Sequence, residues 1–297
     1  MSIQVGFIGL GEAGYFMAKG LHGEGLANAK AFDIAMTLGG SYRQTVEDRA
    51  KDAGVTLLGS IEDVIAASTV VFCAVQAQYA KDVAEKALPV MRPEVIFADV
   101  TTARPSQKES IAEGFNARGF MYVDAAMLGS LPVNMHKVPM LCSGKGAEEL
   151  IAAMKPYNMD MEFMRGAAGM ASRLKLVRSS YTKGTEALAT ETLLLAHKLG
   201  LEQEVLDSLD ASSGKPTFAE AMLRQVRSST IHAERRAHEV EDSVSLMEEC
   251  GIEPVMGRAV IERMKRTAGL GLKEDLKGVT PKTKEEVFAL WDAKKYS

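Results

Sequence analysis

"GFIGLGEAGYFMAKGL", residues 6–21, is an apolar run that ends in spaced glycines and then continues in a helical pattern. The glycines are Gly9, Gly11 and Gly14, so their spacing is G-x-G-x-x-G. Glycine is common in tight turns of every kind. This spacing therefore does not by itself separate an ordinary strand-to-helix turn from a loop that wraps around phosphate groups.

The first half of the chain alternates between short apolar runs and helical patterns. The apolar runs are continuous, which is typical of strands buried on both faces of a parallel sheet. Alternation of such strands with helices predicts a doubly wound α/β fold. We expect strands at 3–10, 29–34, 69–75, 94–100, 121–127 and 138–144, and helices at 13–25, 60–68, 78–91 and 104–119.

The second half changes character near Gly166, after which β-branched runs are sparse and helical patterns follow one another. We therefore predict a Rossmann domain over 1–165 and an all-α domain over 166–297, a division that suits a chain of 297 residues. The predicted helices cover 169–200, 202–212, 217–229, 233–251, 253–269 and 283–295.

Composition excludes several classes of protein. The net charge of −4 gives no field suited to nucleic acid or an anionic membrane. Cys73, Cys142 and Cys250 are far apart, which predicts reduced thiols in the cytoplasm, and the five histidines show no metal-binding spacing. We see no signal peptide and no apolar stretch long enough to span a bilayer.

The surrounding sequence favours the phosphate-binding interpretation of the glycines. They follow a predicted strand and open a predicted helix within a βαβ unit. Gly9 permits the tight turn, Gly11 lets the backbone approach a pyrophosphate, and Gly14 lets the helix pack closely on the strand. The N-terminus of that helix offers free N–H groups and a partial positive charge.

An acidic residue supports a dinucleotide as the ligand. Asp33 ends the second predicted strand, nineteen residues after Gly14. A carboxylate there can accept hydrogen bonds from the ribose hydroxyls and repels a 2′-phosphate, so we expect NAD rather than NADP. Arg43 is the basic residue that could still reach a 2′-phosphate.

Three further stretches, FADVTTARPSQ (97–107), YVDAAMLGS (122–130) and GAAGMASRLKLVRSS (166–180), make the pattern more specific. Together with the glycine motif they resemble the β-hydroxyacid dehydrogenase family, which includes 3-hydroxyisobutyrate and 6-phosphogluconate dehydrogenases. The stretch HAERRAHEVED, residues 232–242, resembles the branch with its own phosphogluconate dehydrogenase-like C-terminal domain. The resemblance covers nearly the whole chain.

The resemblance implies an NAD(P)-dependent oxidoreductase of a small polar hydroxy acid or sugar acid, a homodimer, and a set of site residues. Lys175 matches the family's catalytic lysine. Substrate contacts are implied at Thr101, Thr102, Gly129, Ser130, Ser179 and His238. Cofactor contacts are implied at Gly9, Gly11, Glu12, Ala13, Gly14, Asp33, Val75, Gln76 and Thr101.

The chain also departs from the family pattern. Arg178 and Ser179 replace its asparagine pair, Leu128 to Ser130 replace its Ser-Gly-Gly, and His238 with Glu239 replaces Lys-Asp. The substrate therefore does not transfer. An imine or ketone reductase of the same superfamily and a non-catalytic dinucleotide-binding regulator stay open as alternatives.

The chemistry needs a proton acceptor. A secondary alcohol that loses a hydride must also lose its hydroxyl proton, and a lysine that is partly desolvated near a cationic ring can accept it. Lys175 is the candidate, and Ser179 lies one helical turn further on the same face. Arg178 and Arg236 are candidate carboxylate clamps, and His136 is an alternative acid–base group.

Overall fold

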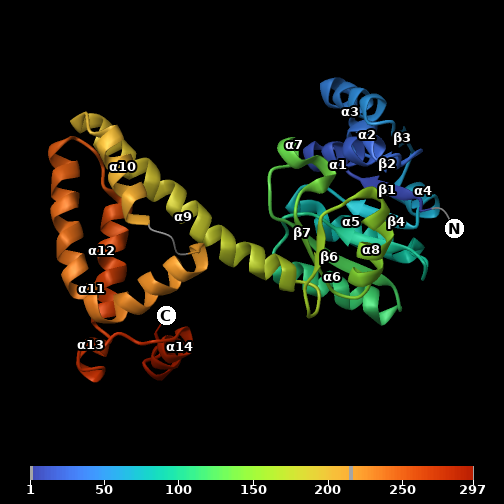
Figure 1. Ribbon diagram of the computed structural model, residues 1–297. Coiled ribbons are helices and arrows are strands. Elements are labelled where there is room, and N and C mark those ends of the chain that lie inside the picture. Colours follow the sequence, from blue (N-terminus) through green and yellow to red (C-terminus); the bar gives the residue numbers. More distant parts are fainter. Residues whose placement is uncertain (1–2, 214–216, 297) are drawn as a thin grey trace. The chain divides into compact units, whose positions relative to one another are not determined.

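The computed structural model describes residues 3–213 and 217–296, and the chain divides into two compact units (Figure 1). The N-terminal unit is Met1–Ser179 and the C-terminal unit is Ser180–Ser297. The division falls inside one long helix, α9 (Met170–Leu199), some residues after the predicted boundary at 165/166.

One mostly parallel sheet forms the centre of the N-terminal unit. Within its described residues, eight strands lie in the order β3-β2-β1-β4-β5-β6-β7-β8, and β6 with β7 is the antiparallel pair. The direction of the order reverses between β1 and β4, and in doubly wound folds ligands bind at the carboxyl ends of the strands at such a point. The strands are β1 (Val5–Ile8), β2 (Lys30–Phe32), β3 (Thr56–Leu57), β4 (Val70–Cys73), β5 (Ile96–Asp99), β6 (Met121–Met127), β7 (Met140–Ser143) and β8 (Met161–Phe163).

Helices cover both faces of the sheet, as the continuous apolar runs predict. Every residue of β1, β4 and β5 is buried. Side chains alternate between the faces, so Phe7 and Phe72 join one core cluster while Ile8 and Val71 join the other. The helices of this unit are α1 (Glu12–Gly23), α2 (Ala35–Leu38), α3 (Gly40–Asp52), α4 (Ile61–Ala66), α5 (Ala80–Ala87), α6 (Pro105–Ala117), α7 (Leu131–Asn134) and α8 (Ala147–Met154).

Local signals fix where several of these helices begin. Ser60 caps α4 by accepting a hydrogen bond from the backbone N–H of Asp63 at 3.1 Å. Pro105 occupies the first turn of α6, where its missing N–H costs nothing. Both starts confirm the predicted helices. The doubly wound fold class is confirmed as well.

Seven strands and α-helices of the described residues were missing from the predicted set, and three of these helices, α2, α7 and α13 (Leu272–Asp275), have only four residues each. Strands β3 and β8 are two and three residues long and lie at the edges of the sheet. Helix α3 buries only Val46 and Ala50, too few to mark a helical face. Helix α8 begins after Gly146 without a side-chain cap.

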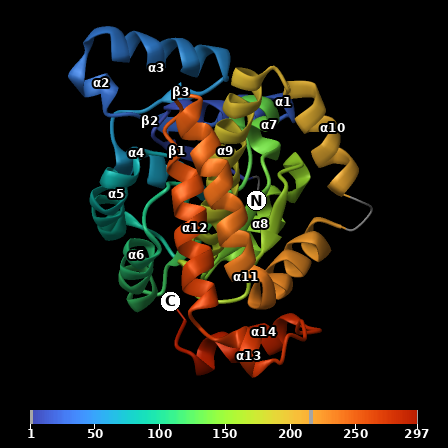
Figure 2. The same ribbon diagram turned by 90° about the vertical axis from the view of Figure 1, so that its left-hand side faces the viewer.

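The C-terminal unit is helical throughout its described residues. Helices α11 and α12 pack side by side (Figures 1 and 2). Glu191 of α9 is buried and accepts hydrogen bonds from the backbone N–H groups of Met256 at 2.9 Å and Gly257 at 2.8 Å, which caps the start of α12. The helices here are the rest of α9, α10 (Glu202–Ser213), α11 (Phe218–Glu249), α12 (Val255–Ala268), α13 (Leu272–Asp275) and α14 (Lys284–Ala293).

The predicted helices over 169–200, 253–269 and 283–295 are confirmed, but the break between 229 and 233 is wrong. Helix α11 runs without interruption from Phe218 to Glu249. Thr230 is tolerated inside it because its hydroxyl donates to the carbonyl oxygen of Arg227 at 2.7 Å and the side chain is buried. In the described part of the chain, no helix has both the length and the apolar character needed to cross a membrane.

The close approach of β1 and α1 makes a testable prediction. A Cβ atom on Gly14 would lie 2.2 Å from the carbonyl oxygen of Gly9, whereas one on Gly23 of the same helix would meet nothing within 4 Å. Gly14→Ala should therefore cost about 1–3 kcal/mol of stability, and Gly23→Ala should be neutral or slightly stabilising. Thermal unfolding followed by circular dichroism measures both. Equal melting temperatures for the two variants would contradict the predicted close contact.

Candidate active site

The predicted cofactor residues lie at one edge of the sheet. Gly9 follows β1, Asp33 follows β2, Val75 comes shortly after β4, and Thr101 comes shortly after β5. These four strands are parallel, so their carboxyl ends meet at the same edge. This is the edge where doubly wound folds bind ligands.

The glycine loop has the geometry that a pyrophosphate requires. Gly9 has a φ of +93°, and a Cβ there would lie 2.8 Å from the carbonyl oxygen of Ala74. Gly11 faces open space, because a Cβ there would meet nothing within 4 Å. Gly11 precedes the first residue of α1 and provides no side-chain cap, so the first N–H groups of the helix are free for an anion. The residues present therefore fit a dinucleotide.

Asp33 holds the glycine loop in place. One carboxylate oxygen accepts from the backbone N–H of Leu10 at 2.7 Å and the other from that of Ala35 at 2.9 Å. Each oxygen keeps a lone pair, so the side chain can also accept from ribose hydroxyls. Arg49 donates to the carbonyl oxygen of Leu10 at 3.2 Å, while Arg43 pairs with Glu47. The basic group beside this loop is thus Arg49, which sequence reasoning missed.

Val75 and Thr101 line the same edge. A methyl group of Val75 would lie 3.0 Å from a Cβ on Gly9, so the end of β4 borders the glycine loop. Thr101 is buried, and its hydroxyl accepts from the backbone N–H of Ala103 at 3.2 Å. Thr102 beside it is exposed, as is Gln76, which follows Val75. These side chains give the edge a mixed apolar and hydroxyl character.

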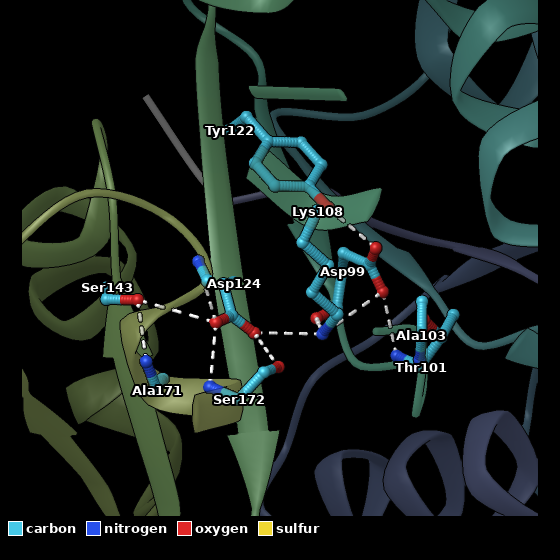
Figure 3. Close-up of polar contacts among 10 residues, drawn as sticks. Asp99, Thr101, Ala103, Lys108, Tyr122, Asp124, Ser143, Ala171 and Ser172 are labelled. Atoms are coloured by element: carbon cyan, nitrogen blue, oxygen red, sulfur yellow. Dashed lines mark hydrogen bonds and ion pairs between the residues drawn. The ribbon is translucent and has the colours of Figure 1, made fainter. Parts of the chain in front are cut away.

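A buried ionic cluster joins three elements behind this edge (Figure 3). Lys108 of α6 has no exposed surface, and its Nζ donates to the carbonyl oxygen of Asp99 at 3.0 Å and to Asp124 Oδ1 at 2.9 Å. Tyr122 donates its hydroxyl hydrogen to Asp99 Oδ2 at 2.6 Å, and the backbone N–H of Thr101 donates to Asp99 Oδ1 at 2.8 Å. Strands β5 and β6 and helix α6 are therefore tied together by charge.

Asp124 also fixes the start of α9. Its Oδ2 accepts from the backbone N–H groups of Gly169 at 3.0 Å and Ser172 at 2.9 Å, and its Oδ1 accepts from the Ser172 hydroxyl at 2.7 Å. The hydroxyl of Ser143 accepts from the backbone N–H of Ala171 at 3.1 Å. The N-terminal N–H groups that a helix normally leaves unpaired are thus satisfied by buried partners (Figure 3).

Lys175 follows Ser172 by three residues on α9, so both side chains share one face of the helix. The side chain of Lys175 is half-buried. Burial lowers the pKa of its ammonium group below the usual range, the nearby charge of Lys108 lowers it further, and Asp124 opposes the shift. Lys175 therefore releases its proton more readily than a solvated lysine.

The other predicted substrate residues lie in three different places, two in the N-terminal unit and one in the C-terminal unit. Gly129 and Ser130 are exposed in the loop after β6, where Leu128 donates its backbone N–H to the carbonyl oxygen of Pro139 at 2.7 Å. Ser179 is the last residue of the N-terminal unit and is half-buried. His238 belongs to the C-terminal unit, on α11, and pairs with Glu241 at 3.0 Å.

Two candidate clamps and the alternative acid–base group also have clear positions. Arg178 is exposed on α9, and Arg236 donates to the Ser228 hydroxyl at 2.7 Å. His136 is 4% exposed and packs against α1 at Gly20, so close that a Cβ there would lie 2.1 Å from its Nδ1. Gly20 is eight residues beyond the start of α1 at Glu12, about 12 Å along the helix from the glycine loop.

Sequence reasoning missed the ionic cluster, although the sequence carries a signal for it. Asp99 and Asp124 are charged residues inside predicted buried strands. Lys108 shares a helical face with Ile111, Ala112 and Phe115, all of them buried. Charged residues on two buried strands and one buried helix face imply mutual pairing, because an unpaired buried charge is strongly unfavourable.

Comparison with known proteins agrees with this geometry. Residues 4–157 match the family described as the NAD binding domain of 6-phosphogluconate dehydrogenase, and residues 196–267 match a domain of unknown function, DUF1932. A 28.5 kDa protein encoded in the 7S RNA 5′ region of Methanothermus fervidus is 29% identical over 254 residues, which cover 86% of this chain and 94% of that protein.

Solved structures extend the comparison. A conserved protein whose structure is described as similar to 3-hydroxyacid dehydrogenases is 31% identical, with a TM-score of 0.60 over 91% of this chain and 99% of that chain. A reductive aminase from Aspergillus terreus, solved with NADPH and ethyl levulinate, has a TM-score of 0.74 at 19% identity over 99% of both chains. At that identity the likeness shows the fold alone.

The buried position of His136 predicts a pH dependence of stability. Burial lowers its pKa in the folded state, and the carboxylate of Glu24, 3.7 Å away, offsets this only in part, while the charge of Lys137 adds to it. The unfolded chain therefore binds a proton first as the pH falls. The stabilising contribution of neutral His136 is present above about pH 6.5 and is lost below it.

We expect the free energy of unfolding, measured with urea between about pH 7.5 and 5.5, to fall more steeply in the wild type than in His136→Gln. The control is His22→Gln, which changes an exposed histidine at the end of α1, the helix against which His136 packs. Parallel curves for the wild type and His136→Gln would show that His136 does not carry this pH dependence.

Proposed function

This chain belongs to the family of the NAD binding domain of 6-phosphogluconate dehydrogenase, and we propose that it transfers a hydride between a nicotinamide cofactor and a small polar hydroxy acid or sugar acid. The observation that carries the proposal is Lys175. It is half-buried, its pKa is lowered, and it lies in the second turn of α9, whose first turn is held by Asp124. A general base needs this combination of fixed position and reduced proton affinity.

The proposed chemistry divides between the cofactor and the chain. When bound, the nicotinamide ring supplies the hydride acceptor in one direction and the donor in the other. The neutral Nζ of Lys175 takes the hydroxyl proton of the substrate as its C–H hydride leaves, so that a ketone forms. In reverse, the ammonium group returns that proton to the carbonyl oxygen. Thr101, Thr102, Gly129, Ser130 and Ser179 are the proposed substrate contacts, with His238 from the C-terminal unit.

We propose NAD as the preferred cofactor and NADP as the weaker one. Asp33 keeps a carboxylate at the end of β2, where it can bind ribose hydroxyls and repel a 2′-phosphate. Arg49 is a basic group that shares a partner with this carboxylate, since both bind the Leu10 backbone. Its guanidinium group is the reason that NADP is not excluded.

A second candidate is the reduction of imines or ketones with a less polar substrate. Met127 and Leu128 are half-buried at the end of β6, and Leu128 stands where the resembled dehydrogenases carry a serine. The reductive aminase from Aspergillus terreus shares the fold. Oxidation of hydroxy acids without reduction of cyclic imines would favour the first proposal, and the reverse result would favour the second.

The domains and the subunits have proposed roles as well. We propose that residues 1–165 hold the cofactor and that residues 166–297 contribute to the substrate site and to a homodimer. Exposed leucines gather on α9, the following loop and α10, in the C-terminal unit, and such apolar surface is typical of subunit contacts. They are Leu188, Leu193, Leu194, Leu199, Leu201, Leu206 and Leu209.

The role of Lys175 is tested by a spectrophotometric screen at 340 nm, the wavelength at which the reduced nicotinamide absorbs. NAD and NADP are each offered with hydroxy acids, sugar acids and imines. Lys175→Met should lower kcat/KM by about 10²–10⁴-fold, the usual contribution of a general base. Lys183→Met, which removes an exposed lysine from the same helix, is the matched control. Full activity of Lys175→Met would reject the proposed base.

The oligomeric state is tested by light scattering on a sizing column at micromolar concentration. We expect twice the chain mass of 32.0 kDa for the wild type. Leu209→Glu, at a leucine that is 57% exposed, should shift the protein towards the monomer. Val133→Glu in the N-terminal unit, 78% exposed, is the control. A monomeric wild type would contradict the proposal.

A further inference from the structure

Among the described residues, Lys108 is the one lysine or arginine whose side chain is fully buried. Removing a charge from water is costly, and a buried ion pair is often no more stabilising than apolar residues of similar volume. The pair formed by Lys108 and Asp124, both without exposed surface, is therefore poorly explained by stability alone. Its placement gives a better explanation.

The contacts form a continuous path from Lys108 to Ser172, three residues before Lys175. Lys108 Nζ donates to Asp124 Oδ1 at 2.9 Å, and the same oxygen accepts from the Ser172 hydroxyl at 2.7 Å. Ser172 lies in the first turn of α9, and Lys175 is three residues further along the same face. The ion pair thus determines where the helix carrying Lys175 begins (Figure 3).

We infer that the buried Lys108–Asp124 ion pair positions Lys175 and sets the electric field at its Nζ, so that Lys108 and Asp124 are positioning residues of the proposed reaction. This inference rests on the proposed function. The two charges act on Lys175 with opposite sign. The cation of Lys108 disfavours a second cation beside it, and the carboxylate of Asp124 favours one.

The other titratable groups around the pair leave this balance intact. Asp99 faces Lys108 at 3.5 Å and is itself bound by the Tyr122 hydroxyl. Burial raises the pKa of Tyr122 and of Cys73, and it raises the pKa of Cys142 to about 12, so all three stay neutral near pH 7. On α9 itself, Arg173 is paired with Glu109 of α6 at 2.6 Å.

Substitutions that remove one or the other of the two opposite charges make the inference testable. Lys108→Met leaves the carboxylate alone, Asp124→Asn removes this carboxylate and keeps the cation, and the double variant removes both charges. The pKa of Lys175, and with it the pH above which Lys175 can act as a base, should rise in Lys108→Met and fall in Asp124→Asn. In the double variant it should return towards the wild-type value. A purely structural role would lower activity at every pH and would not move the profile in two directions.

The first readout is the pH profile of kcat/KM for oxidation. Lys108→Met should lose about tenfold in kcat/KM at pH 7 because less Lys175 is neutral there, and it should recover at higher pH. Arg92→Met is the control, since Arg92 is a cation of the same unit that binds the carbonyl oxygens of Ala66, Ile65 and Ser68 at the end of α4. It should leave the profile where it is.

The second readout needs no turnover and keeps the inference separate from the proposed function. Surface lysines are reductively methylated with ¹³C, the Lys175 signal is assigned by its loss in Lys175→Arg, and its chemical shift is followed against pH. Midpoints that move in opposite directions in Lys108→Met and Asp124→Asn support the inference, even if Lys175→Met retains activity and the proposed base is rejected. Midpoints that move together or stay fixed would overturn it.

Circular dichroism of each variant shows whether it folds. Lys108→Met leaves Asp99 and Asp124 without their buried counter-ion, so it is the variant that is most strongly destabilised. If it does not fold, Asp124→Asn and the double variant still decide the question. The titration midpoint of Lys175 must be lower in Asp124→Asn than in the wild type, and in the double variant it must lie close to the wild-type value. Any other result contradicts the inference.

Discussion

Lys108 extends from α6 to Asp99 at the end of β5 and to Asp124 within β6, and all three side chains are buried. A buried charge is stable only while its partners stay in place, so these contacts restrict how the neighbouring strands and the helix can be arranged. Asp124 transmits the same restriction to the first turn of α9, where it binds two backbone N–H groups and one hydroxyl. The position of Lys175 depends on this arrangement.

A second set of contacts restrains the glycine loop, which follows β1 at the same edge of the sheet. Asp33 accepts hydrogen bonds from Leu10 and Ala35, while Arg49 donates to the carbonyl oxygen of Leu10. The glycine loop is therefore held by side chains from β2's end and from α3, and it presents the open side at Gly11. One carboxylate thus shapes the loop from both of its oxygens. The glycine loop follows β1, and the ionic cluster that holds the start of α9 lies on β5 and β6 of the same sheet.

Much of the fold could be predicted because its signals are local. Continuous apolar runs predicted the buried strands β1, β4 and β5, and Ser60 and Pro105 marked helix starts. Elements with few buried side chains, such as α3, gave no such signal. The break expected near Thr230 was wrong because packing and a side-chain hydrogen bond override a weak local preference.

The sequence by itself determined the fold class, the family and the presence of a dinucleotide loop, since glycine spacing and hydrophobic periodicity act over short distances along the chain. Only the tertiary structure decided which charges meet. Lys108 and Asp124 are sixteen residues apart and Ser172 is a further forty-eight away, so their contacts depend on how β6, α6 and α9 pack. Electrostatic tuning is a property of distance and burial in space, and the order of residues along the chain specifies neither.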